Sequence, residues 1–382
     1  MAITQKIVLL ALLCSVYALT AYSKDAQSQT NDSKDTQVFD EQNVDQQKTQ
    51  NDDEEDSTGH SCKHSHQGAE RLVFEDVTAQ IETYFLSDKT YEAFTLLDDL
   101  KKSHQQDKLD YKETVPQGKC QDDLYEEFMN KVLVKKLELN KATFELRYPQ
   151  LTSTEGWTQF VTEGKKKIFF RKEQGNKVVT QYLEAVIDAP YQNIALLLRA
   201  IELYKEWVPL LSEIKLLGKF SLWRQLMYQK FNAPWPLKGR EVIIEISGYV
   251  LPFEDAFIFS FDSVQGNEWF GNPIKRDKDY VEMLFNKSFG YLKPLGPNQT
   301  LFKFIINSDP QLEFVPPGII DWGIKTVSGG FLDYLINQCQ DIPRAHKRHL
   351  KEHKKEFDEI FKFMEKLSSK FPEEDTINVT NS

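Results

Sequence analysis

Hydrophobic and polar residues alternate along seven runs in the second half of the chain. Alternation with a period of two is typical of strands that bury one face. The runs are residues 166–171, 178–187, 222–231, 241–250, 256–264, 280–292 and 300–307. Two segments with helical spacing, 190–206 and 318–338, lie among and after them. The pattern predicts an antiparallel sheet that is closed by a helix, and one face of such a sheet can line a cavity for a small apolar ligand.

The segment before the strands, residues 69–148, has helical spacing instead. Apolar residues recur three and four positions apart through residues 81–100, and Ser87 or Asp88 is the expected N-cap of a helix within that range. A second helical pattern covers residues 122–146. We expect these helices to pack on the sheet domain or to precede it. The alternative is a hairpin that mediates oligomerisation or binds a partner.

Residues 343–372 are predicted to form a basic amphipathic helix. The stretch Arg344–Phe371 contains nine basic and five acidic residues and no proline or glycine. Its apolar stripe consists of Phe357, Ile360, Phe361, Met364, Leu367 and Phe371. Such a helix can lie on an anionic membrane surface. The alternative is that the stripe packs against the sheet domain or against a second copy of the chain.

Both ends of the chain are expected to lie outside the folded domain. Residues 1–23 have the form of a signal peptide, in which Lys6 precedes an apolar stretch and small residues precede Lys24. Residues 24–68 form an acidic linker, with three lysines against eleven acidic residues up to Gly59, and are expected to be disordered. A disordered tail is expected at 373–382. These features predict a secreted or lumenal protein.

The cysteines and histidines give only weak evidence for a disulfide or a metal site. After removal of the signal peptide, Cys62, Cys120 and Cys339 remain, and an odd number permits at most one internal disulfide. A Cys120–Cys339 bond is our guess because both lie in structured segments, and the other pairings stay open. A histidine cluster, His60–His66, contains residue types that bind zinc or copper, but its polar surroundings favour a simple linker.

Composition limits the classes of partner and reaction. The chain has 382 residues, of which 40% are hydrophobic and 26 are phenylalanine, enough for a large core. A net charge of −11 argues against nucleic acid, whose phosphates need a basic face. His349–His353 matches the H-x-x-E-H pattern of inverted zinc peptidases, yet it lies on a lysine-rich helix without the walls of a cleft. We expect no catalytic residues, no bound metal and no cofactor.

Several short motifs follow one another at spacings that resemble a known family. Glu206-Trp207 ends the first helical segment, and residues 233–241 read Ala-Pro-Trp-Pro-Leu-Lys-Gly-Arg-Glu as they enter a strand. Phe289–Leu295, Asn307–Pro310 and Val315–Gly318 come later in the chain. Together these segments, which cover roughly half the chain, resemble the START (StAR-related lipid-transfer) domain family. In that family a tryptophan ends this helix, and a proline-rich turn runs into Arg-Asp or Arg-Glu.

The resemblance implies an α+β helix-grip fold over residues 149–342. In this fold a curved antiparallel sheet surrounds a long C-terminal helix, and here extra N-terminal and C-terminal helices would be added to it. The ligand would lie between the sheet and the long helix. The mouth of the tunnel would contact a membrane through Trp235 and Leu237, opposite Ile319 and Trp322 of the C-terminal helix.

Alternation and the resemblance together suggest which side chains line the tunnel. On strand 222–231 the face that carries Lys and Arg is expected to meet water, so the other face should line the cavity. On strand 256–262 alternation leaves two choices, and the inward positions of the family favour Ser260 over the neighbouring phenylalanines. The expected ligand-binding residues are Gln225, Met227, Gln229, Ile258, Ser260, Phe302 and Phe304.

The sequence favours a non-catalytic carrier that encloses one lipid or a similar hydrophobe and touches a membrane surface transiently. The alternative is an interaction or structural protein with a filled START-like core and no ligand. An enzymatic use of the cavity ranks third, because no acid–base pair can be assigned. Several family members place charged groups near the helix-ending tryptophan, whereas here Val208 follows Trp207.

Overall fold

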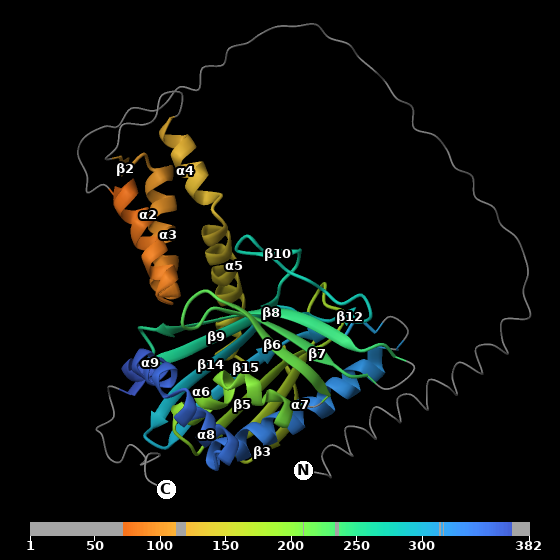
Figure 1. The fold of residues 1–382 in the computed structure, drawn as a ribbon. Coiled ribbons are helices and arrows are strands. Elements are labelled where there is room, and N and C mark those ends of the chain that lie inside the picture. The colour runs from red at the N-terminus through yellow and green to blue at the C-terminus, as the bar shows by residue number, and fades with distance from the viewer. Residues whose placement is uncertain are drawn as a thin grey trace, which may run out of the picture.

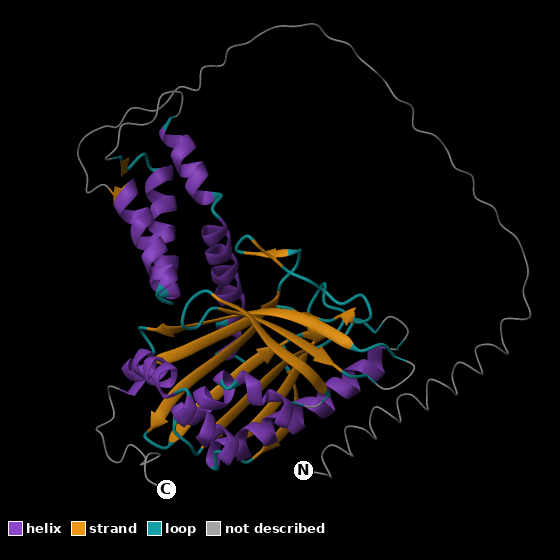
Figure 2. Cartoon of the chain, in the orientation of Figure 1, coloured by secondary structure: helices purple, strands orange, loops and turns teal. Residues whose placement is uncertain are grey.

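The computed structural model describes residues 72–111, 120–208, 210–233, 237–312, 315 and 317–368, and at 317, 319, 322, 326, 366 and 368 it describes the backbone alone. A curved sheet forms the centre of the molecule, with helices on both of its faces (Figure 1). Helices from the first part of the chain cover one face, which we call the outer face, and later helices cover the inner face (Figure 2). The expected α+β class is confirmed.

Nine strands follow one another through the sheet, and every pair along this path is antiparallel. In spatial order they are β3 (Thr158–Glu163), β4 (Lys166–Arg171), β5 (Thr180–Ile187), β15 (Gln299–Ile306), β14 (Ser288–Gly296), β9 (Ala256–Ser263), β8 (Arg240–Leu251), β7 (Gln225–Phe231) and β6 (Leu211–Lys219). The short β12 (Val281–Glu282) adds to β8 in parallel. The described residues also contain three two-residue pairs: β1 (Leu72–Val73) with β2 (Leu109–Asp110), β10 (Glu268–Trp269) with β11 (Asn272–Pro273), and β13 (Leu284–Phe285) with β16 (Ser308–Asp309).

Six of the seven predicted runs contain one long strand each, and the prediction for 280–292 is wrong. That run is divided into β12, β13 and β14, and the chain turns at Lys287, where φ is +47°. The prediction also missed β3 and β6. Both are edge strands whose side chains are mostly exposed or half-buried, so no clear apolar alternation marks them in the sequence.

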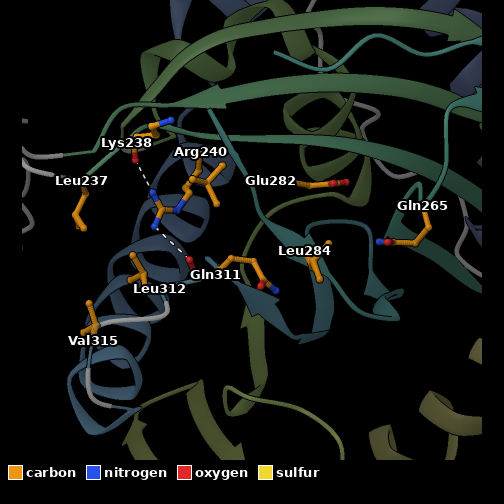
Figure 3. A pocket seen from close by; sticks show the side chains of 10 residues that line it. Leu237, Lys238, Arg240, Gln265, Glu282, Leu284, Gln311, Leu312 and Val315 are labelled. Atoms are coloured by element: carbon orange, nitrogen blue, oxygen red, sulfur yellow. Dashed lines mark hydrogen bonds between the residues drawn. The ribbon is translucent and has the colours of Figure 1, made fainter. Parts of the chain in front are cut away.

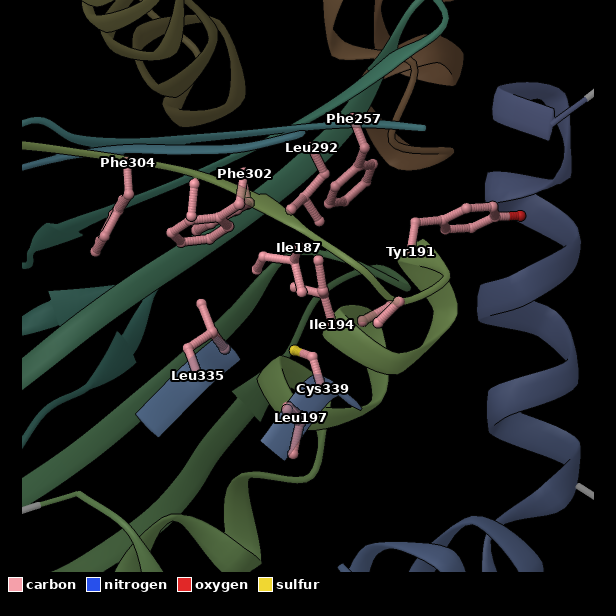
Figure 4. Packing of buried hydrophobic residues seen from close by; sticks show 14 of the residues in the cluster. Ile187, Tyr191, Ile194, Leu197, Phe257, Leu292, Phe302, Phe304, Leu335 and Cys339 are labelled. Atoms are coloured by element: carbon pink, nitrogen blue, oxygen red, sulfur yellow. The ribbon is translucent and has the colours of Figure 1, made fainter. Parts of the chain in front are cut away.

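The inner face is covered by the helices that follow β5 and β16. These are α6 (Tyr191–Arg199), a 3-10 helix (Ile201–Glu206), α7 (Pro317–Gln340), α8 (Arg344–Glu352), α9 (Lys354–Met364) and a 3-10 turn (Glu365–Ser368). Figure 4 shows Leu335 and Cys339 of α7 beneath Phe302 and Phe304 of β15. The sheet therefore wraps around α7, as the helix-grip expectation required.

The outer face is covered by α2 (Phe74–Leu86), α3 (Thr90–Gln105), α4 (Gln121–Met129) and α5 (Val132–Arg147). The expected packing of these helices on the sheet is confirmed by one core cluster that contains residues of α2, α3, α4, α5, β8, β9 and β14. The helical pattern at 122–146 is divided in two at Asn130 and Lys131.

The expected N-cap at Ser87 or Asp88 is wrong. Ser87 caps the C-terminal end of α2, and the residue before α3 is Lys89. Asp88 has a φ of +57°, and its carboxylate accepts hydrogen bonds from the Ser221 hydroxyl at 2.5 Å and the Trp223 amide at 3.0 Å. Asp88 thus joins the α2–α3 turn to the sheet instead of starting a helix.

The C-terminal apolar stripe does not face a membrane. Phe357, Ile360, Met364 and Leu367 are buried in the inner core cluster, so the stripe packs on the domain, which is one of the two arrangements that the sequence allowed. The segment is also broken into α8 and α9 at His353. An apolar face that is covered by its own domain cannot at the same time enter a bilayer.

The guess of a Cys120–Cys339 disulfide is wrong, because both residues are free and buried. Cys120 precedes α4 on the outer side of the sheet, whereas Cys339 lies in α7 on the inner side. The sheet separates the two sulfur atoms. Cys62 and the histidine cluster at 60–66 lie outside the described residues, as do residues 1–23 and 373–382.

Candidate binding site between the sheet and helix α7

Five of the predicted ligand-binding residues lie on the inner face of the sheet. Gln225, Met227 and Gln229 of β7 pair with Ile246, Ile244 and Val242 of β8, and all three are buried. Met227 joins a cluster under the 3-10 helix that follows α6, while Phe302 and Phe304 of β15 join the larger cluster under α7. The partly buried Phe261 contacts both clusters and links them.

Ile258 and Ser260 do not belong to this site. Ile258 lies in the outer cluster with Tyr249 and Tyr291, and the Ser260 hydroxyl lies 2.9 Å from that of Ser247. Phe257, Phe259 and Phe261 occupy the inner face of β9 instead. Alternation alone could not decide which face of β9 points inward. The polar Ser260 lies on the outer face, beside α5, so its polarity wrongly suggested that it faces the ligand.

Aromatic rings fill the described space between β9, β15 and α7. The centroid of Phe304 lies 5.3 Å from that of Phe261, 5.8 Å from Phe259 and 6.3 Å from Phe331 of α7. Gly290 of β14 has no side chain, and the Phe259 ring lies directly over it. Offset and edge-on rings at such distances attract one another, so this cluster holds α7 to the sheet.

A few polar groups interrupt this apolar wall. The Ser328 hydroxyl of α7 donates to Gln181 Oε1 of β5. Among the described residues, the buried Ser288 hydroxyl and the Trp207 indole N–H have no hydrogen-bond partner. Buried polar groups usually have partners, so these two are places where a ligand or a water molecule would bind. The sequence did not point to Ser288, because the residue lay inside the predicted strand 280–292, whereas in the structure it is the first residue of β14.

The predicted mouth coincides in part with a pocket at the edge of the sheet. Leu237 lines a pocket of about 600 Å³ together with Val315, which precedes α7 (Figure 3). Ile319 and Trp322 lie in the first turns of α7, where only the backbone is described. Trp235 lies outside the described residues, so its role stays a prediction.

The motifs that suggested a family now have their places in the fold. Trp207 directly follows the 3-10 helix, and its ring stacks on Tyr334 of α7 with centroids 5.3 Å apart. Arg240 and Glu241 are the first residues of β8. The curved antiparallel sheet holds a long helix near the C-terminus. The fold is START-like.

Three solved structures are similar to parts of this chain. Human STARD10 is 16% identical over 57% of this chain and 86% of its own, with a TM-score of 0.48. Human StAR-related lipid transfer protein 5 is 12% identical over 53% of this chain and 95% of its own, with a TM-score of 0.47. A STAR-related lipid transfer protein from Xanthomonas axonopodis is 16% identical over 49% of this chain and 100% of its own fragment, with a TM-score of 0.41. No family model and no curated protein sequence matches the chain.

The outer face of the START-like domain holds a buried ion-pair network. Arg224 Nη1 donates to Glu245 Oε1 at 2.6 Å, and Lys136 Nζ of α5 donates to Glu245 Oε2 at 2.6 Å. The Trp269 indole donates to the same Oε2 at 2.9 Å. Burial raises the pKa of Glu245, but the charges of Arg224 and Lys136 outweigh burial, so its pKa lies below the ordinary value. The expectation that the Arg224 face meets water is wrong, because α5 covers it.

Asp262, on the outer face of β9, is a half-buried carboxylate whose pKa is shifted in the opposite direction. Burial raises the pKa of Asp262 to about 6, against the hydrogen bond that it accepts from the Lys287 amide. A carboxyl with a higher pKa in the folded state than in the unfolded chain binds more protons when folded. Stability therefore falls as the pH rises from about 4 to about 6, and the loss is complete above that window.

Replacing Asp262 by asparagine should therefore stabilise the protein at neutral pH. We expect Asp262→Asn to raise the free energy of unfolding by about 1–3 kcal/mol at about pH 7 and to change it little at about pH 4. The amide oxygen can still accept from the Lys287 amide, so the packing is kept. Urea unfolding at both pH values measures the difference. A gain of equal size at the two pH values contradicts the assignment of a raised pKa to Asp262.

The helix α8 does not build the zinc site that its motif resembled. His349 and His353 have ring centroids 4.3 Å apart, and His349 Nε2 lies 3.6 Å from a carboxylate oxygen of Glu202. In the part of the chain that the structure describes, no three His, Cys, Asp or Glu side chains come together as metal ligands. Across the same ranges, no helix is both long and apolar enough to cross a membrane.

Proposed function

We propose that this protein binds one hydrophobic molecule, a lipid or a similar compound, between the inner face of its START-like domain and α7, and carries it without catalysis. The observation that supports this function most is the character of the inner face. Aromatic and aliphatic side chains dominate it, and isolated polar groups such as Gln225, Gln229 and Ser288 interrupt it. Apolar walls with a few polar groups combine affinity with a fixed orientation of the ligand.

A second candidate is an interaction protein whose START-like core is filled. The rings of Phe259, Phe261, Phe302 and Phe304 favour it, since their centroids lie 5.3 to 6.4 Å apart. A carrier with this interior has to separate these rings, or to move α7 from the sheet, when the ligand enters. The two candidates therefore differ in whether the purified protein contains or takes up a lipid.

Native mass spectrometry of the purified chain, before and after exposure to liposomes of mixed lipids, distinguishes these functions. The carrier is expected to show a discrete adduct with the mass of a lipid. Phe304→Trp enlarges a ring on the inner face and should weaken uptake about tenfold, which corresponds to about 1.4 kcal/mol. Phe253→Trp is the matched control, because Phe253 is exposed at the outer side beside Tyr91 and Tyr148. A protein that stays ligand-free in both measurements favours the filled core.

We also propose that the protein acts in the secretory pathway or outside the cell, in transient contact with membranes. The signal-peptide pattern of residues 1–23 supports the location, and the position of Leu237 at the edge pocket supports the contact. N-terminal sequencing of protein purified from a secretory host tests the location. Cleavage before Lys24 is expected, and an intact N-terminus contradicts it.

A further inference from the structure

The edge pocket is separate from the aromatic cluster under α7. Its walls come from the turn before β8, from β12 and β13, and from the segment that precedes α7 (Figure 3). Ten residues line its volume of about 600 Å³: Leu237, Lys238, Arg240, Gln265, Val281, Glu282, Leu284, Gln311, Leu312 and Val315. Five of these are aliphatic, and two are cationic, so the pocket has an apolar wall and a positive end.

No carboxylate of the described residues balances the charge of Arg240 at the positive end. Its guanidinium is largely buried, and its partners in the described part of the chain are backbone carbonyls, those of Pro310 at 2.6 Å, Lys238, and Gln311 at 3.5 Å. Burial lowers the pKa of Arg240, as expected for a cation without a counter-ion. Within the described ranges, no carboxylate lies at ion-pair distance from Arg240 or Lys238.

Other arginines with buried side chains differ in this respect. Arg147 lies 2.6 Å from Glu173, Arg224 lies 2.6 Å from Glu245, and Arg199 lies 2.9 Å from Glu356. A buried cation without such a partner is costly, because its desolvation is not offset by an opposite charge. Among the described residues Arg240 has carbonyl partners alone, so an anion that enters the pocket would offset its charge.

Two described acidic residues near the pocket, Glu282 and Asp309, already have partners. Glu282 lines the pocket, but its carboxylate lies 3.2 Å from Arg276 Nε. Asp309 is paired with Leu284 in the β13–β16 ladder, and it accepts hydrogen bonds from the Gln311 amide and side chain. Neither of them neutralises Lys238 or Arg240, so the positive end of the pocket keeps its charge.

We propose that this pocket binds the phosphate-bearing headgroup of an anionic lipid. The inference rests on the proposed function and names its ligand class. A guanidinium has five N–H donors, and three of its bonds go to carbonyls, so two N–H groups remain for phosphate oxygens. The exposed Lys238 adds a second positive charge at the rim, and the aliphatic side chains of Leu237, Leu312 and Val315 can contact the first carbons of the acyl chains.

Titration calorimetry of the full chain with three probes tests this headgroup site. The probes are monomeric dihexanoyl phosphatidic acid, dihexanoylglycerol, which lacks the phosphate, and inorganic phosphate. Phosphatidic acid is expected to bind at least about tenfold more tightly than the other two, because it alone fills both the positive end and the apolar wall. Inorganic phosphate that binds as tightly as phosphatidic acid overturns the lipid headgroup in favour of a free anion.

A substitution that reverses the charge of Lys238 tests the headgroup site further. Lys238→Glu should weaken the binding of dihexanoyl phosphatidic acid at least about tenfold and leave that of dihexanoylglycerol unchanged. Lys238 is preferred to Arg240, whose loss would also free three backbone carbonyls. Lys172→Glu is the matched control, since Lys172 is exposed and follows β4, on the other half of the sheet.

The outcomes separate the headgroup site from the carrier function. The headgroup site is overturned if Lys238→Glu leaves the binding of phosphatidic acid unchanged, or if dihexanoylglycerol binds as tightly as phosphatidic acid. A lipid adduct in native mass spectra still supports the carrier function in that case. If no lipid adduct forms, the carrier fails. A phosphate-dependent signal that Lys238→Glu abolishes would then mark the pocket as a surface site for anionic headgroups.

Discussion

Glu245→Gln is expected to lower the free energy of unfolding by about 3–5 kcal/mol, because it leaves Arg224 charged and buried without a carboxylate. Arg224 is fully buried, and the substitution leaves its guanidinium with uncharged acceptors alone among the described residues, such as the Asn140 side-chain oxygen at 2.9 Å. The substitution also removes the ion pair between Glu245 and Lys136 of α5. Urea unfolding at neutral pH measures the loss.

The exposed pair Lys165–Asp188 is the matched control for this prediction. Its two side chains are 53% and 50% exposed, so Asp188→Asn should cost at most about 1 kcal/mol. Replacing both members of the buried pair, as in Arg224→Met with Glu245→Leu, should recover most of the stability that Glu245→Gln loses. Losses of similar size in Glu245→Gln and Asp188→Asn would falsify the assignment of a strong buried pair.

Gly290→Ala is expected to cost about 3 kcal/mol, since a Cβ atom at this position would lie 2.0 Å from Cζ of Phe259. Ring atoms at the end of a side chain can often move aside. Here the Phe259 ring is confined by Phe261, Phe302 and Phe304, whose centroids lie 5.8 to 6.4 Å from its own. The inner core must therefore rearrange to admit one methyl group.

Thermal and urea unfolding of a double-mutant cycle measure this contact. In a Phe259→Leu background the cost of Gly290→Ala should fall, because the smaller side chain leaves room for the new methyl group. Gly296→Ala, at the end of the same strand, is the control, since its Cβ would meet nothing within 4 Å, and we expect a change below about 0.5 kcal/mol. An unchanged cost in the Phe259→Leu background shows that another contact limits this position.

Much of the architecture could be predicted from local pattern. Runs of apolar and polar residues with a period of two were enough to recognise β4, β5, β8 and β9, and the spacing of α7 marked the closing helix. The pattern failed at β3 and β6, where the sheet edge leaves both faces partly exposed. It also failed at the turn around Lys287, since a positive φ at a non-glycine residue has no reliable signal in one sequence.

The site was predicted less completely. Alternation identified the inner side of β7, with Gln225, Met227 and Gln229, because one face of that strand carried Arg and Lys. The same reasoning went wrong about Arg224, since the charge that seemed to need water is balanced by Glu245 under α5. Which face of β9 is inward could not be decided, because both of its faces are buried.

The sequence by itself determined the elements that depend on short-range order: the strand periods, the long closing helix, and the tryptophan and arginine motifs that resemble START domains. Only the tertiary structure decided which face of β9 contacts α7, that the C-terminal stripe packs inside, and that Arg240 contacts backbone carbonyls where the other buried arginines contact carboxylates. The physical reason is that burial and charge balance arise between residues distant in the chain. Glu245 contacts Lys136 from a distant part of the chain, and Leu284, Leu312 and Val315 of the aliphatic wall lie far from Arg240 in the sequence.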